Sequence, residues 1–136
     1  MDPEIWGPHC WQFLHSITLA YPDNPTLEDK NNHAQFFNGI QNILPCQSCR
    51  DHYTQNLQAL PVEQYLENKE SLFRWSVDIH NRVNVINNKR EYSYEEVTEL
   101  YEKMYDKSDD NTYGKSVGSK LIGNKWLFIL LIVLLI

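Results

Sequence analysis

A chain of 136 residues has room for one domain, and its formal net charge of −6 argues against a basic nucleic-acid-binding surface. Three cysteines are an odd number, which excludes a fully paired secreted disulfide framework. The first residues, Met1-Asp2-Pro3-Glu4, contain no basic stretch followed by an apolar run. We therefore expect no cleaved signal peptide and a chain that is made in the cytosol, where thiols are normally reduced.

The apolar spacing predicts an all-helical fold, and no segment shows the alternation that is typical of a strand. A first helix is predicted over about 6–20, and Tyr21-Pro22 ends it because the residue before proline avoids helical backbone. A second helix begins near Thr26, which can form a capping-box variant with Asp29. The apolar residues at helical spacing along this second helix are Phe36, Phe37, Ile40, Ile43 and Leu44.

Pro45 ends the second helix and can occupy the first position of a third, which reaches about Leu60. This places Cys46 and Cys49 in its first turns. A fourth helix is predicted over about 68–87, and a short fifth helix opens at Ser93 with a capping box. The fourth helix carries two neighbouring stripes, Leu72, Ile79, Val83 and Ile86 beside Phe73, Val77, His80 and Asn84.

The composition changes after about residue 105. Residues 106–120 are rich in Asp, Asn, Ser, Gly and Lys, which predicts a flexible linker between a domain at 1–105 and an apolar tail at 121–136. The run 126–136 would rise roughly 16 Å as a helix, against about 30 Å of hydrocarbon, so we expect a membrane-anchor helix in a thinned bilayer. Three lysines before the run favour a domain that faces the cytosol: Lys115, Lys120 and Lys125.

The pair Pro45-Cys46-Gln47-Ser48-Cys49 carries the strongest chemical signal. At the amino end of a helix, free N–H groups and the helix dipole stabilise a thiolate, which is the nucleophile and electron donor in thiol chemistry. Zinc binding by Cys46, Cys49 and His52 is the alternative, although a fourth ligand is hard to find. A thioredoxin-like role is disfavoured because no βαβ pattern surrounds the pair.

Two further sets of residues have the spacing of a shared helix face. His80 and Asn84 are four apart, with Asn81 beside them, and burying these groups is costly unless they form hydrogen bonds. A planar ligand with a polar edge would supply partners; a polar seam between helices or a solvated face is the alternative. Trp11 and His15 are also four apart, and they fit either a cofactor contact or core packing.

The motifs W-G-P-x-x-W-x-x-L-H, P-C-x-x-C and H-N-x-V-N occur in that order between about residues 6 and 105. Together they resemble the Erv/ALR family of FAD-linked sulfhydryl oxidases. The resemblance implies a four-helix bundle with a short fifth helix, FAD at the mouth of the bundle, and a dimer in most members. It also implies an enzyme that oxidises thiols to disulfides and reduces oxygen to hydrogen peroxide.

By the same resemblance, Cys46 corresponds to the interchange cysteine that takes electrons from substrate thiols, and Cys49 to the flavin-proximal one. The positions that correspond to residues around the FAD are Gly7, Trp11, His15, Tyr53, His80, Asn81, Val83, Asn84, Lys89 and Tyr92. Cys10 shares a stripe with apolar residues, so we expect a small buried hydrophobic residue there, with an intersubunit bond as the alternative.

The chain departs from the family pattern in three ways. Asn87-Asn88-Lys89-Arg90 stands where the family has Leu-Gly-Lys-Pro, and both a structural disulfide and a flexible shuttle C-x-x-C are missing. In this it is similar to short members from large cytoplasmic DNA viruses, which implies a separate thioredoxin-like protein as electron donor and a place in a host membrane or the virion. A membrane-anchored, zinc-binding helical adaptor remains the alternative function.

Overall fold

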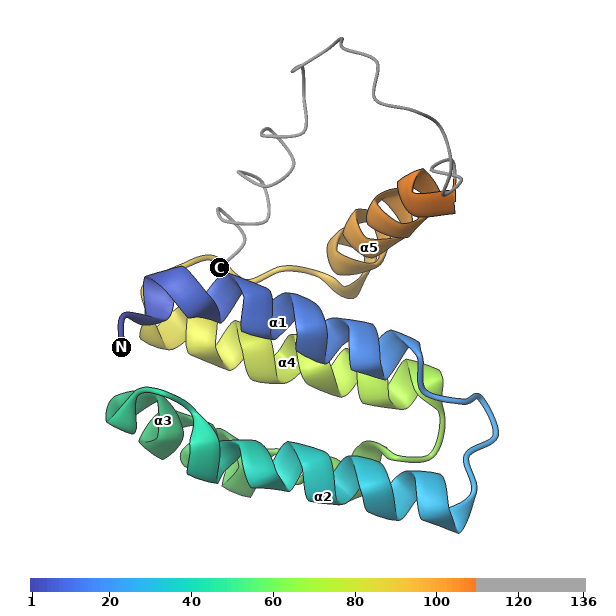
Figure 1. Cartoon of the computed structure of the whole chain (residues 1–136), viewed down its shortest axis with the longest axis horizontal. Helices are drawn as coiled ribbons and strands as arrows, with labels where there is room; N and C mark the ends of the chain where they lie inside the picture. Colours follow the sequence, from blue (N-terminus) through green and yellow to red (C-terminus); the bar gives the residue numbers. More distant parts are fainter. Residues whose placement is uncertain (110–136) are drawn as a thin grey trace, which may run out of the picture. The chain divides into compact units, whose positions relative to one another are not determined.

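The computed structural model describes residues 1–109, and within them every regular element is helical, as the sequence predicts (Figure 1). A short 3-10 helix, η1, was not predicted from the sequence. In chain order the elements are α1 (Pro3–Leu19), α2 (Leu27–Ile43), α3 (Gln47–Ala59), η1 (Val62–Tyr65), α4 (Lys69–Ile86) and α5 (Tyr94–Asp109).

The elements fall into two units. Residues 1–91 form the first, in which α1 packs along α4, α2 packs along α3, and α3 also contacts α4. Figure 1 shows the α1–α4 pair and the α2–α3 pair as two adjacent layers of this unit. The helix α5 belongs to the second unit and is 16 residues long, so the prediction of a short fifth helix is wrong.

Local side-chain caps set two of the helix starts that the sequence indicates. Thr26 and Asp29 form a reciprocal capping box, in which the Asp29 N–H donates to Thr26 Oγ1 at 3.1 Å and the Thr26 N–H donates to Asp29 Oδ2 at 2.8 Å. Ser93 and Glu96 make the same pair of contacts before α5. Both predicted capping boxes are therefore confirmed.

The third helix begins later than predicted. Cys46 has extended backbone, φ −125° and ψ 128°, and is the N-cap of α3, so only Cys49 lies in the first turn. Its sulfur accepts a hydrogen bond from the Cys49 N–H at 3.3 Å, which is the contact that an N-cap side chain makes. Pro45 consequently precedes the helix and does not occupy its first position.

The core of the first unit lies between α1, α2, α3 and α4. Trp75 is 1% exposed at its centre, and its indole N–H donates to the Leu60 carbonyl at 2.9 Å. On α2 only part of the predicted apolar face is buried, since Phe36 is 38% and Ile43 76% exposed. The buried cluster comprises Leu14, Tyr21, Phe37, Ile40, Tyr53, Leu57, Val62, Leu66, Leu72, Trp75 and Ile79.

None of the helices within residues 1–109 is both long enough and apolar enough to cross a membrane. The predicted anchor at 121–136 and residues 110–120 of the predicted linker lie outside the described residues. The helix α5 continues to Asp109, so the first residues of the predicted linker, 106–109, are helical instead.

Candidate functional site

The two cysteines lie at the amino end of α3, and both are free thiols. Cys46 Sγ lies 3.1 Å from Ser48 Oγ and 3.3 Å from the Cys49 backbone nitrogen. Three donors thus gather around one sulfur: the Cys49 thiol, the Ser48 hydroxyl and the Cys49 N–H. This arrangement stabilises negative charge on Cys46.

The two thiols consequently differ in acidity. The hydrogen bond from the Cys49 thiol, together with those from Ser48 and the Cys49 N–H, lowers the pKa of Cys46 to about 7. Burial, followed by the hydrogen bond to Cys46 and its charge, raises the pKa of Cys49 to about 11. Near neutral pH the reduced pair therefore carries at most one negative charge; it lies on Cys46, which is about half ionised at pH 7.

A second cluster joins α1 to α4. His15 Nδ1 lies 2.8 Å from Ser76 Oγ, and His15 Nε2 lies 3.0 Å from His80 Nδ1. The ring of Trp11 stacks on that of His80 with their centroids 4.0 Å apart and their planes 6° from parallel. These contacts fix both imidazole planes.

Both histidines of this cluster are neutral at physiological pH. Burial lowers the pKa of His15 to about 4. The pKa of His80 lies well below its ordinary value because of burial first, and because of His15 and the positive charge of Lys89 as well. A neutral imidazole has one donor and one acceptor nitrogen, so the cluster can present a fixed hydrogen-bond pattern.

Some buried polar atoms of the first unit have no hydrogen-bond partner in the described part of the chain. His80 Nε2 and Asn84 Nδ2 are two of them, and they lie one turn apart on the same helix. Each such atom costs on the order of 1–3 kcal/mol, so an unpaired pair on one face points to a ligand that completes it. Gly7 on α1 is also buried, yet a Cβ placed on it would meet no atom within 4 Å.

The end of α4 is a tight turn. The Lys89 N–H donates to the Asn84 carbonyl at 2.8 Å and the Asn88 N–H to the Val85 carbonyl at 3.1 Å, while Asn88 has a φ of 55°. These are the two bonds of a Schellman motif, with Asn88 in its left-handed position. The turn holds the exposed Lys89 close enough for its charge to act on His80.

Polar contacts fix α3 to its neighbours. The hydroxyl of Tyr53, one turn after Cys49, donates to the Phe37 carbonyl on α2 at 3.2 Å. Arg82 on α4 donates through Nε to Asn56 Oδ1 on α3 at 2.9 Å. The helix that carries the cysteines is thus held against both α2 and α4.

Comparisons with known proteins identify the family of this chain. The chain matches the Erv1/Alr family over residues 8–103, which is more than half of its length. It belongs to the Erv1/Alr family. Among its relatives is the protein named "Probable FAD-linked sulfhydryl oxidase R368" of Acanthamoeba polyphaga mimivirus, which is 40% identical over 114 residues, or 83% of this chain and 80% of that one.

Further relatives share the family. A FAD-linked sulfhydryl oxidase of African swine fever virus is 34% identical over 113 residues, which are 82% of this chain and 90% of the viral protein. Among solved structures, the FAD binding domain of Erv1 from Saccharomyces cerevisiae superposes with a TM-score of 0.65 at 32% identity, over 68% of this chain and 87% of that one. The all-helical architecture is therefore the fold of that domain.

The structure brings some of the predicted site residues together. Trp11, His15 and His80 are in direct contact across α1 and α4, and the charge of Lys89 acts on His80. Asn84 and Gly7 are buried in the same unit, whereas Asn81 and Val83 are half-buried on α4. Tyr92 begins the second unit and is not placed relative to the others. The assignment of these residues to FAD stays a prediction.

The sequence analysis assigned no role to Ser76 and Thr18, two residues with buried hydroxyl groups that contact His15. Ser76 Oγ binds His15 Nδ1, and the Thr18 hydroxyl donates to the His15 carbonyl at 2.9 Å and lies 3.2 Å from Ser76 Oγ. Ser76 lies one turn before His80 on α4, and this spacing was the available signal.

The zinc alternative has no support in the described part of the chain. Across residues 1–109, no three His, Cys, Asp or Glu side chains come together as metal ligands, so Cys46, Cys49 and His52 do not form the predicted set.

Proposed function

We propose that this protein is a FAD-linked sulfhydryl oxidase that forms disulfides in other proteins and passes the electrons to oxygen, giving hydrogen peroxide. The observation that carries the proposal is the polarised thiol pair of α3, in the same unit as an aromatic and imidazole site with unsatisfied polar atoms. Membership of the Erv1/Alr family, whose named relatives are FAD-linked sulfhydryl oxidases, supports it.

The residues of the first unit fit a flavin nucleotide. Trp11 and His80 provide stacked rings, and the unpaired His80 Nε2 and Asn84 Nδ2 are partners for the polar edge of a planar ring system. The empty space on the Cβ side of Gly7 leaves room for a ligand beside α1. Lys89, at the end of α4, supplies the positive charge that a diphosphate needs.

The thiol exchange follows from the two cysteines. With the pair oxidised, a partner thiolate attacks Cys46 Sγ, the Cys46–Cys49 bond breaks, and Cys49 leaves with the electron pair. The second thiol of the partner then attacks the partner's first sulfur, which is bonded to Cys46 in the mixed disulfide, and Cys46 is expelled. Because the pKa of Cys46 is about 7, its thiolate is a good leaving group in this second step.

The reduced pair is the form in which both cysteines are free thiols. When Cys46 is ionised, its thiolate accepts the hydrogen bond of the Cys49 thiol, so the pair holds one proton between the two sulfurs. Re-forming the disulfide then releases two electrons and, with Cys46 already ionised, one proton. The bound flavin supplies the chemistry that accepts these electrons and transfers them to oxygen.

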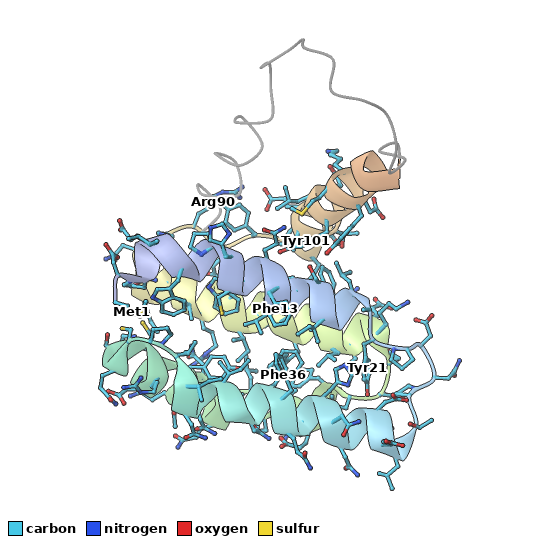
Figure 2. The ribbon with its side chains drawn as sticks, in the orientation of Figure 1. Met1, Phe13, Tyr21, Phe36, Arg90 and Tyr101 are labelled. Atoms are coloured by element: carbon cyan, nitrogen blue, oxygen red, sulfur yellow. The ribbon has the colours of Figure 1, made fainter. Side chains whose placement is uncertain are left out.

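The proposal also covers the electron donor, the location of the protein in the cell and its oligomeric state. The three cysteines of this sequence provide one C-x-x-C pair, so we propose a thioredoxin-like dithiol protein as the electron donor. The apolar tail, residues 121–136, would anchor the protein in a host or virion membrane with the oxidase domain in the cytosol. A homodimer is part of the proposal, since Phe13 and Phe36 extend toward each other between α1 and α2 and both are exposed (Figure 2).

A visible spectrum and one substitution test the function. The purified protein should be yellow, and excess dithiothreitol under nitrogen should bleach the flavin absorbance. Cys49→Ser should abolish oxygen consumption while FAD stays bound, whereas the control Cys10→Ser should keep both. A colourless protein, or undiminished turnover in Cys49→Ser, would refute the proposal.

A further inference from the structure

The hydrogen positions in the buried cluster of α1 and α4 follow from one hydroxyl group. Ser76 Oγ carries a single hydrogen and lies 2.7 Å from the carbonyl oxygen of Phe73, which can only accept a hydrogen bond. This is the bond that a helical serine forms with its own preceding turn. With that hydrogen committed, the 2.8 Å contact between Ser76 Oγ and His15 Nδ1 is a hydrogen bond only if His15 is the donor.

The donor role of His15 Nδ1 in turn determines which nitrogen of His80 is protonated. A neutral His15 that is protonated at Nδ1 has an acceptor at Nε2, so the 3.0 Å contact with His80 requires the hydrogen on His80 Nδ1. His80 then has a bare lone pair at Nε2, the buried atom that has no hydrogen-bond partner within residues 1–109. The Thr18 hydroxyl donates to the His15 carbonyl and leaves this order unchanged.

The opposite order gives up the hydrogen bond from Ser76 to the Phe73 carbonyl. If Ser76 donated to His15 Nδ1, His15 would be protonated at Nε2 and would donate to His80 Nδ1. His80 would then carry a buried N–H at Nε2 without an acceptor. The positive charge of Lys89 acts on this ring and disfavours its doubly protonated form, so His80 keeps one bare nitrogen. The stacked indole of Trp11 keeps the ring in one plane, so the lone pair keeps one direction.

We infer that Ser76 is a positioning residue: through His15 it fixes His80 as a hydrogen-bond acceptor at Nε2, which receives an N–H or O–H group of the bound flavin nucleotide. The inference rests on the proposed function for the identity of the ligand. The order of hydrogens itself is a property of this chain, and it can be measured whether or not flavin is bound.

Nitrogen-15 NMR of the purified full chain, carrying the flavin with which it is isolated, tests the order directly. Long-range proton–nitrogen spectra distinguish protonated from bare imidazole nitrogens. We expect His15 and His80 both to be protonated at Nδ1 and bare at Nε2. A protonated His80 Nε2 would overturn the inference without any variant being made.

Substitutions at Ser76 test the dependence on the hydroxyl. In Ser76→Ala, His15 loses its acceptor and the hydrogens are free to reverse, so we expect protonation at His80 Nε2. Losing one buried hydrogen bond to the ligand should speed flavin release about tenfold, followed by the rise in flavin fluorescence. Ser76→Thr keeps the hydroxyl and should restore the parent tautomer and release rate.

The matched control is Ser71→Ala, the same substitution on the first turn of α4. It should leave both readouts unchanged. A Ser76→Ala protein with the parent tautomer, or with flavin release no faster than that of Ser71→Ala, would overturn the role of Ser76. A colourless parent protein would refute the proposed function and the ligand assignment together, while its NMR spectrum would still decide the order of hydrogens.

Discussion

Acid should destabilise this protein before its carboxylates titrate, because His15 is buried as a neutral group. The pKa of His15 is about 4 in the folded chain, against 6.5 in the unfolded chain, and the side chain is 2% exposed. Between these values the unfolded state binds the additional proton, so the stability is fully present above pH 6.5 and falls as the pH drops toward 4.

The size of the effect follows from the same two values. One pKa unit corresponds to about 1.4 kcal/mol, so the complete loss below pH 4 is on the order of 3 kcal/mol. At pH 5 the unfolded imidazole is almost fully protonated and the folded one is not, which makes the loss about 2 kcal/mol relative to pH 8. This is a large share of the stability of a small domain.

Urea denaturation of the full chain at pH 8 and pH 5, followed by tryptophan fluorescence, measures the total loss, to which the buried His80 also contributes because its pKa is lowered as well. The difference between the parent and His15→Gln isolates the share of His15. His15→Gln should be less stable than the parent at pH 8 but should lose about 2 kcal/mol less on acidification. His9→Gln, at an exposed histidine of the same helix, should follow the parent. Equal losses in the parent and His15→Gln would refute the assignment of the titration to His15.

Three further outcomes are expected. Iodoacetamide at pH 7 should alkylate Cys46 before Cys49 in the reduced protein, because only the first has a pKa near 7; equal rates by mass spectrometry would contradict this. Asn88→Val should lower the unfolding free energy by about 1 kcal/mol or more and Asn88→Gly should not, since φ is 55°; equal urea midpoints would argue against the left-handed turn. Trp75→Ala should cost about 3–5 kcal/mol in the same assay and the exposed Phe13→Ala far less, and similar losses would place the core elsewhere.

The parts of the fold that the sequence predicts correctly depend on residues close together in the chain. The pairs Thr26–Asp29 and Ser93–Glu96 start their helices through contacts between residues three positions apart. The local sequence alone therefore determines where these two helices begin. The exposure of Phe36 has a different cause. It lies beside the buried Phe37 on α2, and the packing of α2 on other elements decides which of the two rings turns inward.

The candidate site shows the same division. The spacing of Trp11 and His15, and of His80 and Asn84, predicts that each pair shares a helix face. Nothing in that spacing says that the two faces meet, because the contact between His15 and His80 joins residues 65 positions apart. The spacing of Ser76 and His80 likewise places them on one face of α4 and says nothing of the contact with His15, which lies on the partner helix.

The departure at 87–90 from the family's Leu-Gly-Lys-Pro has a physical account in the turn after α4. The position that corresponds to the family's glycine is Asn88, and its φ of 55° is a conformation that asparagine tolerates better than other side chains with a Cβ. The Schellman bonds therefore form, and the Lys89 N–H still reaches the Asn84 carbonyl. Because the side chain of Asn84 belongs to the candidate site, the turn that ends the helix also fixes one residue of that site and the basic residue beside it.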